Sequence, residues 1–196
     1  MFNMLNKERQ DKFVVMCVGY THSGKTTFAK KLVKDVGEIV LLDNDEIATF
    51  INEKYPLAVF SDYNKVKRTY KEPNLKFLLF QEVFKFCLRA GVNVIHSSGN
   101  LGKDSRQFIK INTKKYNYKL VTVYFNLPKE LISERIKNTK KDTKAFKSSK
   151  SWSEILPRQE LYAELPPSKM DTIYFEIQNE ADYKSVLNEL KNLLLK

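Results

Sequence analysis

The most constraining feature of the chain is an eight-residue stretch, Gly19-Tyr20-Thr21-His22-Ser23-Gly24-Lys25-Thr26. It has the spacing G-x-x-x-x-G-K-[ST], and it lies between an apolar run at 13–18 and an amphipathic segment at 24–36. Glycines at both ends let the backbone approach an anion at a distance that a Cβ would prevent. The N–H groups of such a loop and of the following helix cradle phosphate oxygens. The stretch therefore predicts a phosphate-binding loop at a strand–helix junction.

The residues of this loop have separable roles. Lys25 is expected to reach the β- and γ-phosphates of ATP, and Thr26 to place its hydroxyl on a magnesium ion. His22 occupies a variable position, where a loop-stabilising or solvent-exposed role is expected. The predicted nucleotide site comprises Gly19, Tyr20, Thr21, His22, Ser23, Gly24, Lys25, Thr26 and Thr27.

The rest of the chain alternates short apolar runs with longer amphipathic segments, which is typical of a parallel α/β sheet. Strands are expected at 13–18, 38–42, 92–96, 120–125 and 172–177. Helices are expected at 24–36, 45–54, 73–90, 103–116, 126–136, 153–163 and 180–195. We predict one domain over 1–196 with a three-layer αβα fold, a sheet of about five strands and a small helical lid at 137–158.

The overall composition indicates which kinds of partner and which cellular compartment to expect. The formal net charge of +11 favours polyanions such as nucleotides or nucleic acid, although a lysine-rich composition alone also gives a basic chain. Cys17 and Cys87 each lie in an apolar run, which predicts two buried thiols and no disulfide framework. No apolar run is long enough for a membrane span and the N-terminus does not resemble a signal peptide, so a cytoplasmic protein is expected.

Two classes of phosphate-loop protein are disfavoured by what the chain lacks. The guanine-reading Asn-Lys-x-Asp segment of GTPases does not occur, because Asn64-Lys65-Val66-Lys67 has no aspartate. Motor ATPases usually carry an acidic residue at the end of an apolar strand. The best candidate strand here, at 92–95, is followed by His96-Ser97-Ser98. A switch or a motor is therefore not the expected class.

Acidic residues occur instead directly after the second predicted strand, in Leu42-Asp43-Asn44-Asp45-Glu46. In this the chain resembles the small P-loop kinases, a group that includes the AAA_33, zeta-toxin-like and polynucleotide-kinase-like phosphotransferases. The resemblance implies that Asp45 accepts the proton of the attacking hydroxyl, and that Asp43 lies near magnesium or substrate. Asp45 could instead cap the following helix, and either aspartate could be the base. The family often has an arginine three residues further on, where this chain has Ala48.

The same resemblance extends to later segments. Asn100 and Arg106 follow the third strand, where the related kinases hold substrate, although Arg106 could also be an exposed helical residue. Arg135 and Arg158 lie near the two ends of the predicted lid, and either could stabilise the charge of the transferred phosphoryl group.

The predicted lid is rich in lysine. Its lysines recur at steps of about three or four, which would align them on one face of a helix. Such a stripe could close on ATP, follow a nucleic-acid backbone, or form an ordinary solvated surface. These residues are Lys137, Lys140, Lys141, Lys144, Lys147 and Lys150.

The sequence thus favours an ATP- and magnesium-dependent kinase. Its acceptor would be a hydroxyl on a small molecule, a nucleoside or a nucleic-acid 5′ end. The alternative is a nucleotide- or nucleic-acid-binding module that does not transfer phosphate. The acidic pair Asp43 and Asp45 favours the kinase.

Overall fold

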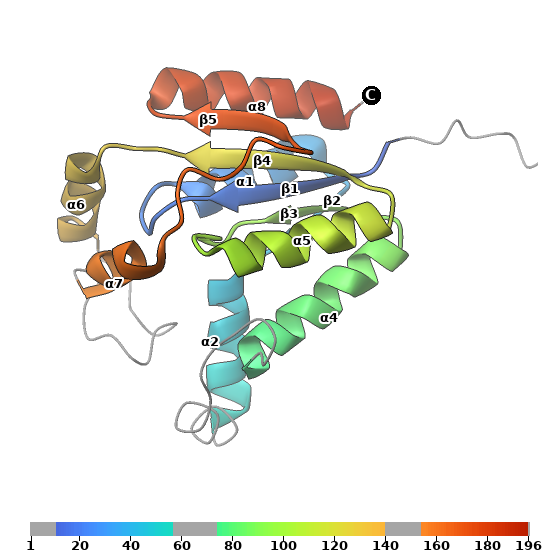
Figure 1. Cartoon of the computed structure of the whole chain (residues 1–196), viewed down its shortest axis with the longest axis horizontal. Helices are drawn as coiled ribbons and strands as arrows, with labels where there is room; N and C mark the ends of the chain where they lie inside the picture. Colours follow the sequence, from blue (N-terminus) through green and yellow to red (C-terminus); the bar gives the residue numbers. More distant parts are fainter. Residues whose placement is uncertain (1–10, 57–73, 140–153, 196) are drawn as a thin grey trace, which may run out of the picture.

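The computed structural model describes residues 11–56, 74–139 and 154–195 of the chain (Figure 1). Its strands are β1 (Phe13–Val18), β2 (Ile39–Leu42), β3 (Asn93–His96), β4 (Lys119–Phe125) and β5 (Ile173–Ile177). Its helices are α1 (Lys25–Val36), α2 (Asn44–Lys54), α4 (Leu75–Arg89), α5 (Lys103–Lys115), α6 (Lys129–Lys137), α7 (Ile155–Tyr162) and α8 (Glu180–Leu194). The predicted element order is confirmed within the described residues.

The five strands form one parallel sheet in the order β2-β3-β1-β4-β5. In register, Met16 of β1 lies beside His96 of β3, and Leu42 of β2 lies on the other side of His96. The carboxyl ends of β1, β2 and β3 therefore meet at one edge of the sheet. In α/β folds this is the edge at which ligands bind.

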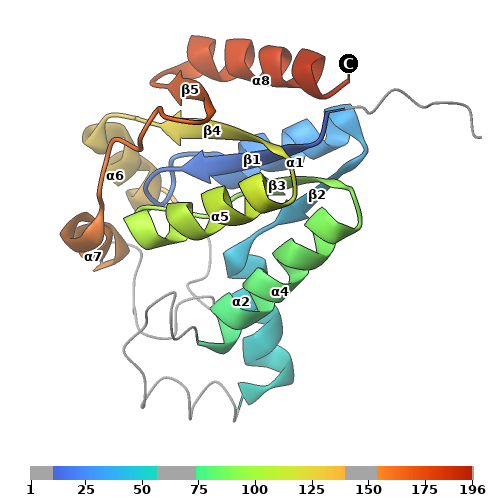
Figure 2. The same cartoon turned by 45° about the vertical axis from the view of Figure 1, so that its right-hand side comes forward.

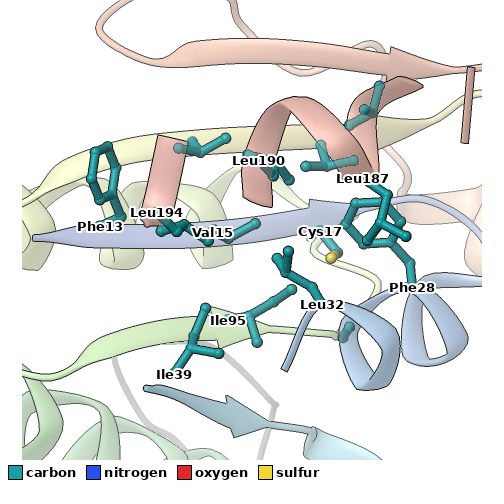
Figure 3. Packing of buried hydrophobic residues seen from close by; sticks show 14 of the residues in the cluster. Phe13, Val15, Cys17, Phe28, Leu32, Ile39, Ile95, Leu187, Leu190 and Leu194 are labelled. Carbon is teal, nitrogen blue, oxygen red and sulfur yellow. The ribbon is translucent and has the colours of Figure 1, made fainter. Parts of the chain in front are cut away.

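Both faces of the sheet are covered by helices. Successive side chains of β1 point to opposite faces of the sheet. Val15 and Cys17 pack with α1 and α8 (Figure 3). Val14 and Met16 pack with α4 and α5 on the other face. Every residue of β1 is buried, as expected for a central parallel strand. The three-layer αβα fold predicted from the sequence is therefore confirmed.

The hydrophobic core between the sheet and helices α1 and α8 anchors the helix that follows the phosphate loop. Phe28 of α1 is fully buried and meets Phe125 and Tyr183 edge-on, with ring centroids 5.5 and 5.3 Å away. Cys17 and Cys87 are buried and free, as predicted. Because its packing fixes α1, the core also fixes the direction in which the amino end of α1 points.

Three helices surround the carboxyl edge of the sheet. Helix α2 leaves the end of β2, and α6 and α7 lie side by side beyond the ends of β1 and β4 (Figures 1 and 2). Among the described helices, none is long and apolar enough to cross a membrane.

Candidate nucleotide and phosphoryl-transfer site

The phosphate loop connects β1 to α1 with the tight backbone that its glycines predict. Gly19 has φ of 150°, and its N–H donates to the carbonyl of Gly99 at 2.9 Å. A Cβ on Gly19 would lie 2.9 Å from the carbonyl oxygen of Phe125, so a larger residue would have to displace backbone. Gly24 has φ of 96°, which favours glycine, and it starts α1.

The amino end of α1 is arranged to meet an anion. Within the described residues no side chain caps Gly24, and no acidic residue occupies the first turn. The first N–H groups of a helix have no partner inside the helix and carry a partial positive charge. Lys25 is buried beside them, with its Nζ donating to Ser23 Oγ at 3.1 Å and to the carbonyl of Tyr20. The loop therefore combines backbone donors with a cation, which fits phosphate.

A cluster of three polar side chains, Thr26, Asp43 and Ser97, lies at the carboxyl ends of the strands; we call it the strand-end cluster. Thr26 Oγ1 donates to Asp43 Oδ2 at 3.0 Å, and Ser97 Oγ donates to the same oxygen at 2.8 Å. The two hydroxyl oxygens are 3.3 Å apart. Asp43 and Ser97 are only 5% and 3% exposed. Hydroxyl and carboxylate oxygens are the donors that magnesium prefers, so this cluster fits the predicted metal site at Thr26 and Asp43.

The capping alternative proposed for Asp45 is wrong, because Asp43 is the residue that caps α2. Asp43 has extended backbone angles, and its Oδ1 accepts from Asp45 N at 2.8 Å. The carboxylate of Asp43 is thus held on both oxygens. Asp45 lies in the first turn of α2, where it is exposed and lines the cleft.

Asn100 is a buried residue of the loop that follows β3. Its Nδ2 donates to the carbonyl of Cys17 at 2.8 Å and lies 3.1 Å from Nδ1 of His96. His96 is fully buried and stacks on Phe80, with ring centroids 4.2 Å apart. Burial lowers the pKa of His96 to about 3, so the ring is neutral. Substrate binding by Asn100 stays a prediction, and its amide nitrogen is already bonded to protein.

Arg106 is half buried, so the expectation of an exposed helical residue is wrong. Its guanidinium donates to the carbonyls of Asn100 at 2.8 Å, Leu101 at 2.6 Å and Glu164 at 2.8 Å. Burial lowers its pKa, partly offset by the nearby Glu164 carboxylate. Arg106 therefore ties the β3–α5 loop to the segment after α7, and substrate contact by Arg106 stays a prediction.

The arginines predicted at the two ends of the lid both lie at the cleft. Arg135 on α6 donates from Nη1 to the carbonyl of His22 at 3.2 Å, and Arg158 on α7 lines the same cleft. Most of the lysine stripe, from Lys140 to Lys150, lies outside the described residues. The structure thus places both candidate cations near the phosphate loop.

Two residues of the site were missed by sequence reasoning. Ser97 was not among the predicted site residues, yet its hydroxyl donates to Asp43. Gln159 on α7 accepts from Thr21 N at 2.8 Å. Ser97 could have been found from its position at the end of a predicted strand, whereas no local signal marks Gln159.

One cleft of about 1430 Å³ brings these groups together. Thr26 and Ser97 line it while Asp43 lies behind them. Residues of α6, α8 and the phosphate loop line the cleft, as do Asp45, Phe77 and Tyr162. Within the described ranges no three His, Cys, Asp or Glu residues cluster as a metal site.

The fold and this site define a P-loop NTPase of the kinase-like kind, as predicted from the sequence. A family model described as an AAA domain, AAA_33, matches residues 14–161, and the chain belongs to this family. No curated protein matches the sequence significantly.

Solved structures share the fold over nearly the whole chain. A presumed kinase from Chloroflexus aurantiacus superposes with a TM-score of 0.68 at 12% identity, covering 94% of this chain and 97% of that one. APS kinase of Mycobacterium tuberculosis, in complex with AMPPNP and APS, gives 0.60 at 12% identity, with 95% and 99% covered. Kti12 from Chaetomium thermophilum, in complex with ADP-AlF3, gives 0.58 at 17% identity, with 92% and 98% covered.

Proposed function

We propose that the protein is an ATP-dependent kinase that transfers the γ-phosphate to a hydroxyl group. The observation that carries the proposal is the pair of aspartates beside the phosphate loop. Asp43 is buried and hydrogen-bonded to Thr26, whereas Asp45 is two residues away and open to the cleft. The position of Asp43 beside Thr26 suits a role on the metal side, and Asp45 lines the cleft in which an acceptor would bind.

In this mechanism the loop residues bind and orient the phosphates. The N–H groups at the start of α1 donate to oxygens of the β-phosphate, and Lys25 turns toward the β- and γ-phosphates. Magnesium, when bound, would neutralise charge on the phosphate oxygens. Thr26 would hold it directly, and Asp43 would orient Thr26 through the hydrogen bond between them.

Asp45 would act as the general base. Its carboxylate accepts the proton of the acceptor hydroxyl while the hydroxyl oxygen forms a bond to the γ-phosphorus. The bond from that phosphorus to the β–γ bridging oxygen breaks, and ADP leaves with that oxygen. Arg135 and Arg158 lie on the opposite side of the loop, where a guanidinium can stabilise charge on the transferred group.

The lining of the cleft limits the substrate class only broadly. Beside the phosphate loop it includes lysines (Lys76, Lys103), aromatic rings (Phe77, Tyr162) and the carboxylate of Asp45. This mixture suits a hydroxyl compound with an anionic or planar part, which includes phosphorylated small molecules, nucleosides and nucleic-acid 5′ ends. APS kinase, which shares the fold, was solved with AMPPNP and APS and supports a nucleotide-like acceptor among these.

The test is transfer of γ-labelled phosphate from Mg-ATP to pooled metabolites, nucleosides and 5′-hydroxyl oligonucleotides. We expect one class to be labelled, with loss of labelling in Lys25→Ala and in Asp45→Ala. Glu53→Gln is a matched control, because Glu53 is exposed on the same helix as Asp45 and does not line the cleft. Tight ATP binding with no transfer to any acceptor would instead identify a non-catalytic binding module.

A further inference from the structure

Gln159 on α7 holds the backbone of the phosphate loop from the opposite side of the cleft. Its Oε1 accepts from the N–H of Thr21 at 2.8 Å. A backbone N–H can only donate, so the side-chain atom that faces it must be the amide oxygen of Gln159. The amide nitrogen of Gln159 is therefore directed away from the Thr21 N–H. Gln159 is half buried and lines the cleft. Among the described residues this nitrogen donates to no protein acceptor.

The same peptide group is held on its other side by Lys25. The carbonyl of Tyr20, which shares its peptide plane with the N–H of Thr21, accepts from Lys25 Nζ. The lysine of a phosphate loop reaches the β- and γ-phosphates when nucleotide is bound, so Lys25 must redirect at least part of its hydrogen bonding toward them. Gln159 can hold the Tyr20–Thr21 peptide in place while Lys25 moves.

A second contact brings the neighbouring helix to the next residue of the loop. Arg135 of α6 donates to the carbonyl of His22 at 3.2 Å, and Lys129 of α6 pairs with Glu160 of α7 at 2.6 Å. Helices α6 and α7 thus meet the outer part of the loop, residues 21 and 22, while the amino end of α1 forms its inner part. A phosphate chain that starts at the inner part places its terminal group at the outer part.

We propose that Gln159 is a positioning residue for the terminal phosphate of a bound nucleoside triphosphate. Its oxygen fixes the Thr21 peptide, and its nitrogen offers two N–H donors to the γ-phosphate. The proposal rests on the proposed function, since it requires a triphosphate in the loop. A diphosphate ends before it reaches Gln159, so this residue should distinguish ATP from ADP.

The test compares binding of Mg-ADP and of Mg-AMPPNP to the full chain by calorimetry. Gln159→Met keeps the length of the side chain and removes both hydrogen-bonding groups. We expect it to lower AMPPNP affinity by about three- to tenfold, the effect of a single hydrogen bond, and to leave ADP affinity within about twofold. Gln107→Met is the matched control, because Gln107 is exposed on α5 and does not line the cleft. Both affinities should match wild type in this control.

Gln159→Glu separates the two ends of the amide. A glutamate still accepts from the Thr21 N–H, but it presents negative charge to the γ-phosphate, so AMPPNP affinity should fall further than in Gln159→Met. Equal loss of both nucleotides in Gln159→Met, or wild-type AMPPNP affinity in Gln159→Glu, would overturn the proposal. If Gln159→Met does not fold, Gln159→Glu decides by itself. Wild-type protein that binds neither nucleotide would refute the proposed function instead.

Discussion

The two sides of the cleft are built in different ways. The strand-end cluster is buried and held by three elements, with Asp43 accepting hydrogen bonds from Thr26 and Ser97 and from the backbone of α2. The side formed by α6 and α7 is exposed, and its described contacts with the phosphate loop are the hydrogen bonds of Arg135 and Gln159. The two sides therefore differ in how strongly the core constrains them.

This difference separates two requirements of phosphoryl transfer. The groups that bind phosphate and metal must be in place before the reaction, and burial in a packed core provides this. Groups that close over the transferred phosphate must admit and release substrate, which a few exposed polar contacts allow. We therefore expect substitutions in the strand-end cluster to have the larger effects, and those on α6 and α7 the smaller.

The largest effects should come from the two aspartates, and they should differ in kind. Asp45→Asn removes the proposed base, so transfer should fall by about 10²- to 10⁴-fold with an unchanged magnesium requirement. Asp43→Asn removes a group that orients a metal ligand, so transfer should fall by about 10- to 100-fold and recover in part at high magnesium. The measurement is the transfer rate across a magnesium titration. The opposite pattern would exchange the two roles.

Buried His96 should make the free energy of unfolding of the protein depend on pH. Its pKa is lowered by burial from 6.5 to about 3, with the nearby Asp43 carboxylate opposing the shift. Only the unfolded chain binds this proton between those values, so stability is full above pH 6.5 and falls as pH decreases below it. The slope due to His96 is up to about 1.4 kcal/mol per pH unit.

Urea unfolding at several pH values from 5 to 7.5 measures this slope. Between pH 5 and 6.5, the free energy of unfolding of His96→Gln should change less with pH than that of the wild type. Phe84→Leu is a suitable control, since it removes packing from the same core without removing a titrating group. A His96→Gln variant with the wild-type slope would show that His96 does not contribute.

The sequence predicted the elements and the loop well, because their causes are local. The buried run at 13–18 forms β1 over the same residues, and the glycine spacing of the loop requires the backbone angles observed at Gly19 and Gly24. The two acids after β2 were also located, but not told apart. Which of them caps α2 depends on the residue at which the strand ends, and propensity does not determine that within one or two residues.

The contacts between distant segments could not be predicted. Ser97 contacts Asp43 because β3 lies next to β2 in the sheet. The order of strands in a sheet cannot be read from the hydrophobic pattern of the sequence. Gln159 meets Thr21 across 138 positions of sequence. An exposed helical residue was one of the two alternatives for Arg106, whereas its guanidinium donates to the carbonyl of Glu164 in the segment after α7. In each case tertiary packing determines the role of a residue whose local pattern is uninformative.

Ser97 tests how much of the buried side depends on one hydrogen bond. Ser97→Ala removes a donor to Asp43 and changes the volume of the side chain very little. Transfer should fall by about tenfold, the effect expected for the loss of one hydrogen bond to a charged group. Ser98→Ala is the matched control, because the Ser98 hydroxyl accepts from Asn44 N at 3.3 Å and has no described bond to Asp43. Its effect should be below about threefold. Equal effects of the two serines would indicate general disturbance of the loop.

The ion pair between α6 and α7 should have the smallest effect. Lys129 and Glu160 are 65% and 35% exposed, and pairs this accessible to water contribute little. Their hydrogen bond raises the pKa of Lys129. Lys129→Gln should slow transfer by less than about fivefold, and high salt should reduce the difference from wild type. The control is Lys184→Gln, which removes a similarly exposed pair with Glu180 on α8. If Lys129→Gln instead slowed transfer as much as Ser97→Ala, the exposed side would be as tightly constrained as the buried one, and the contrast between them would fail.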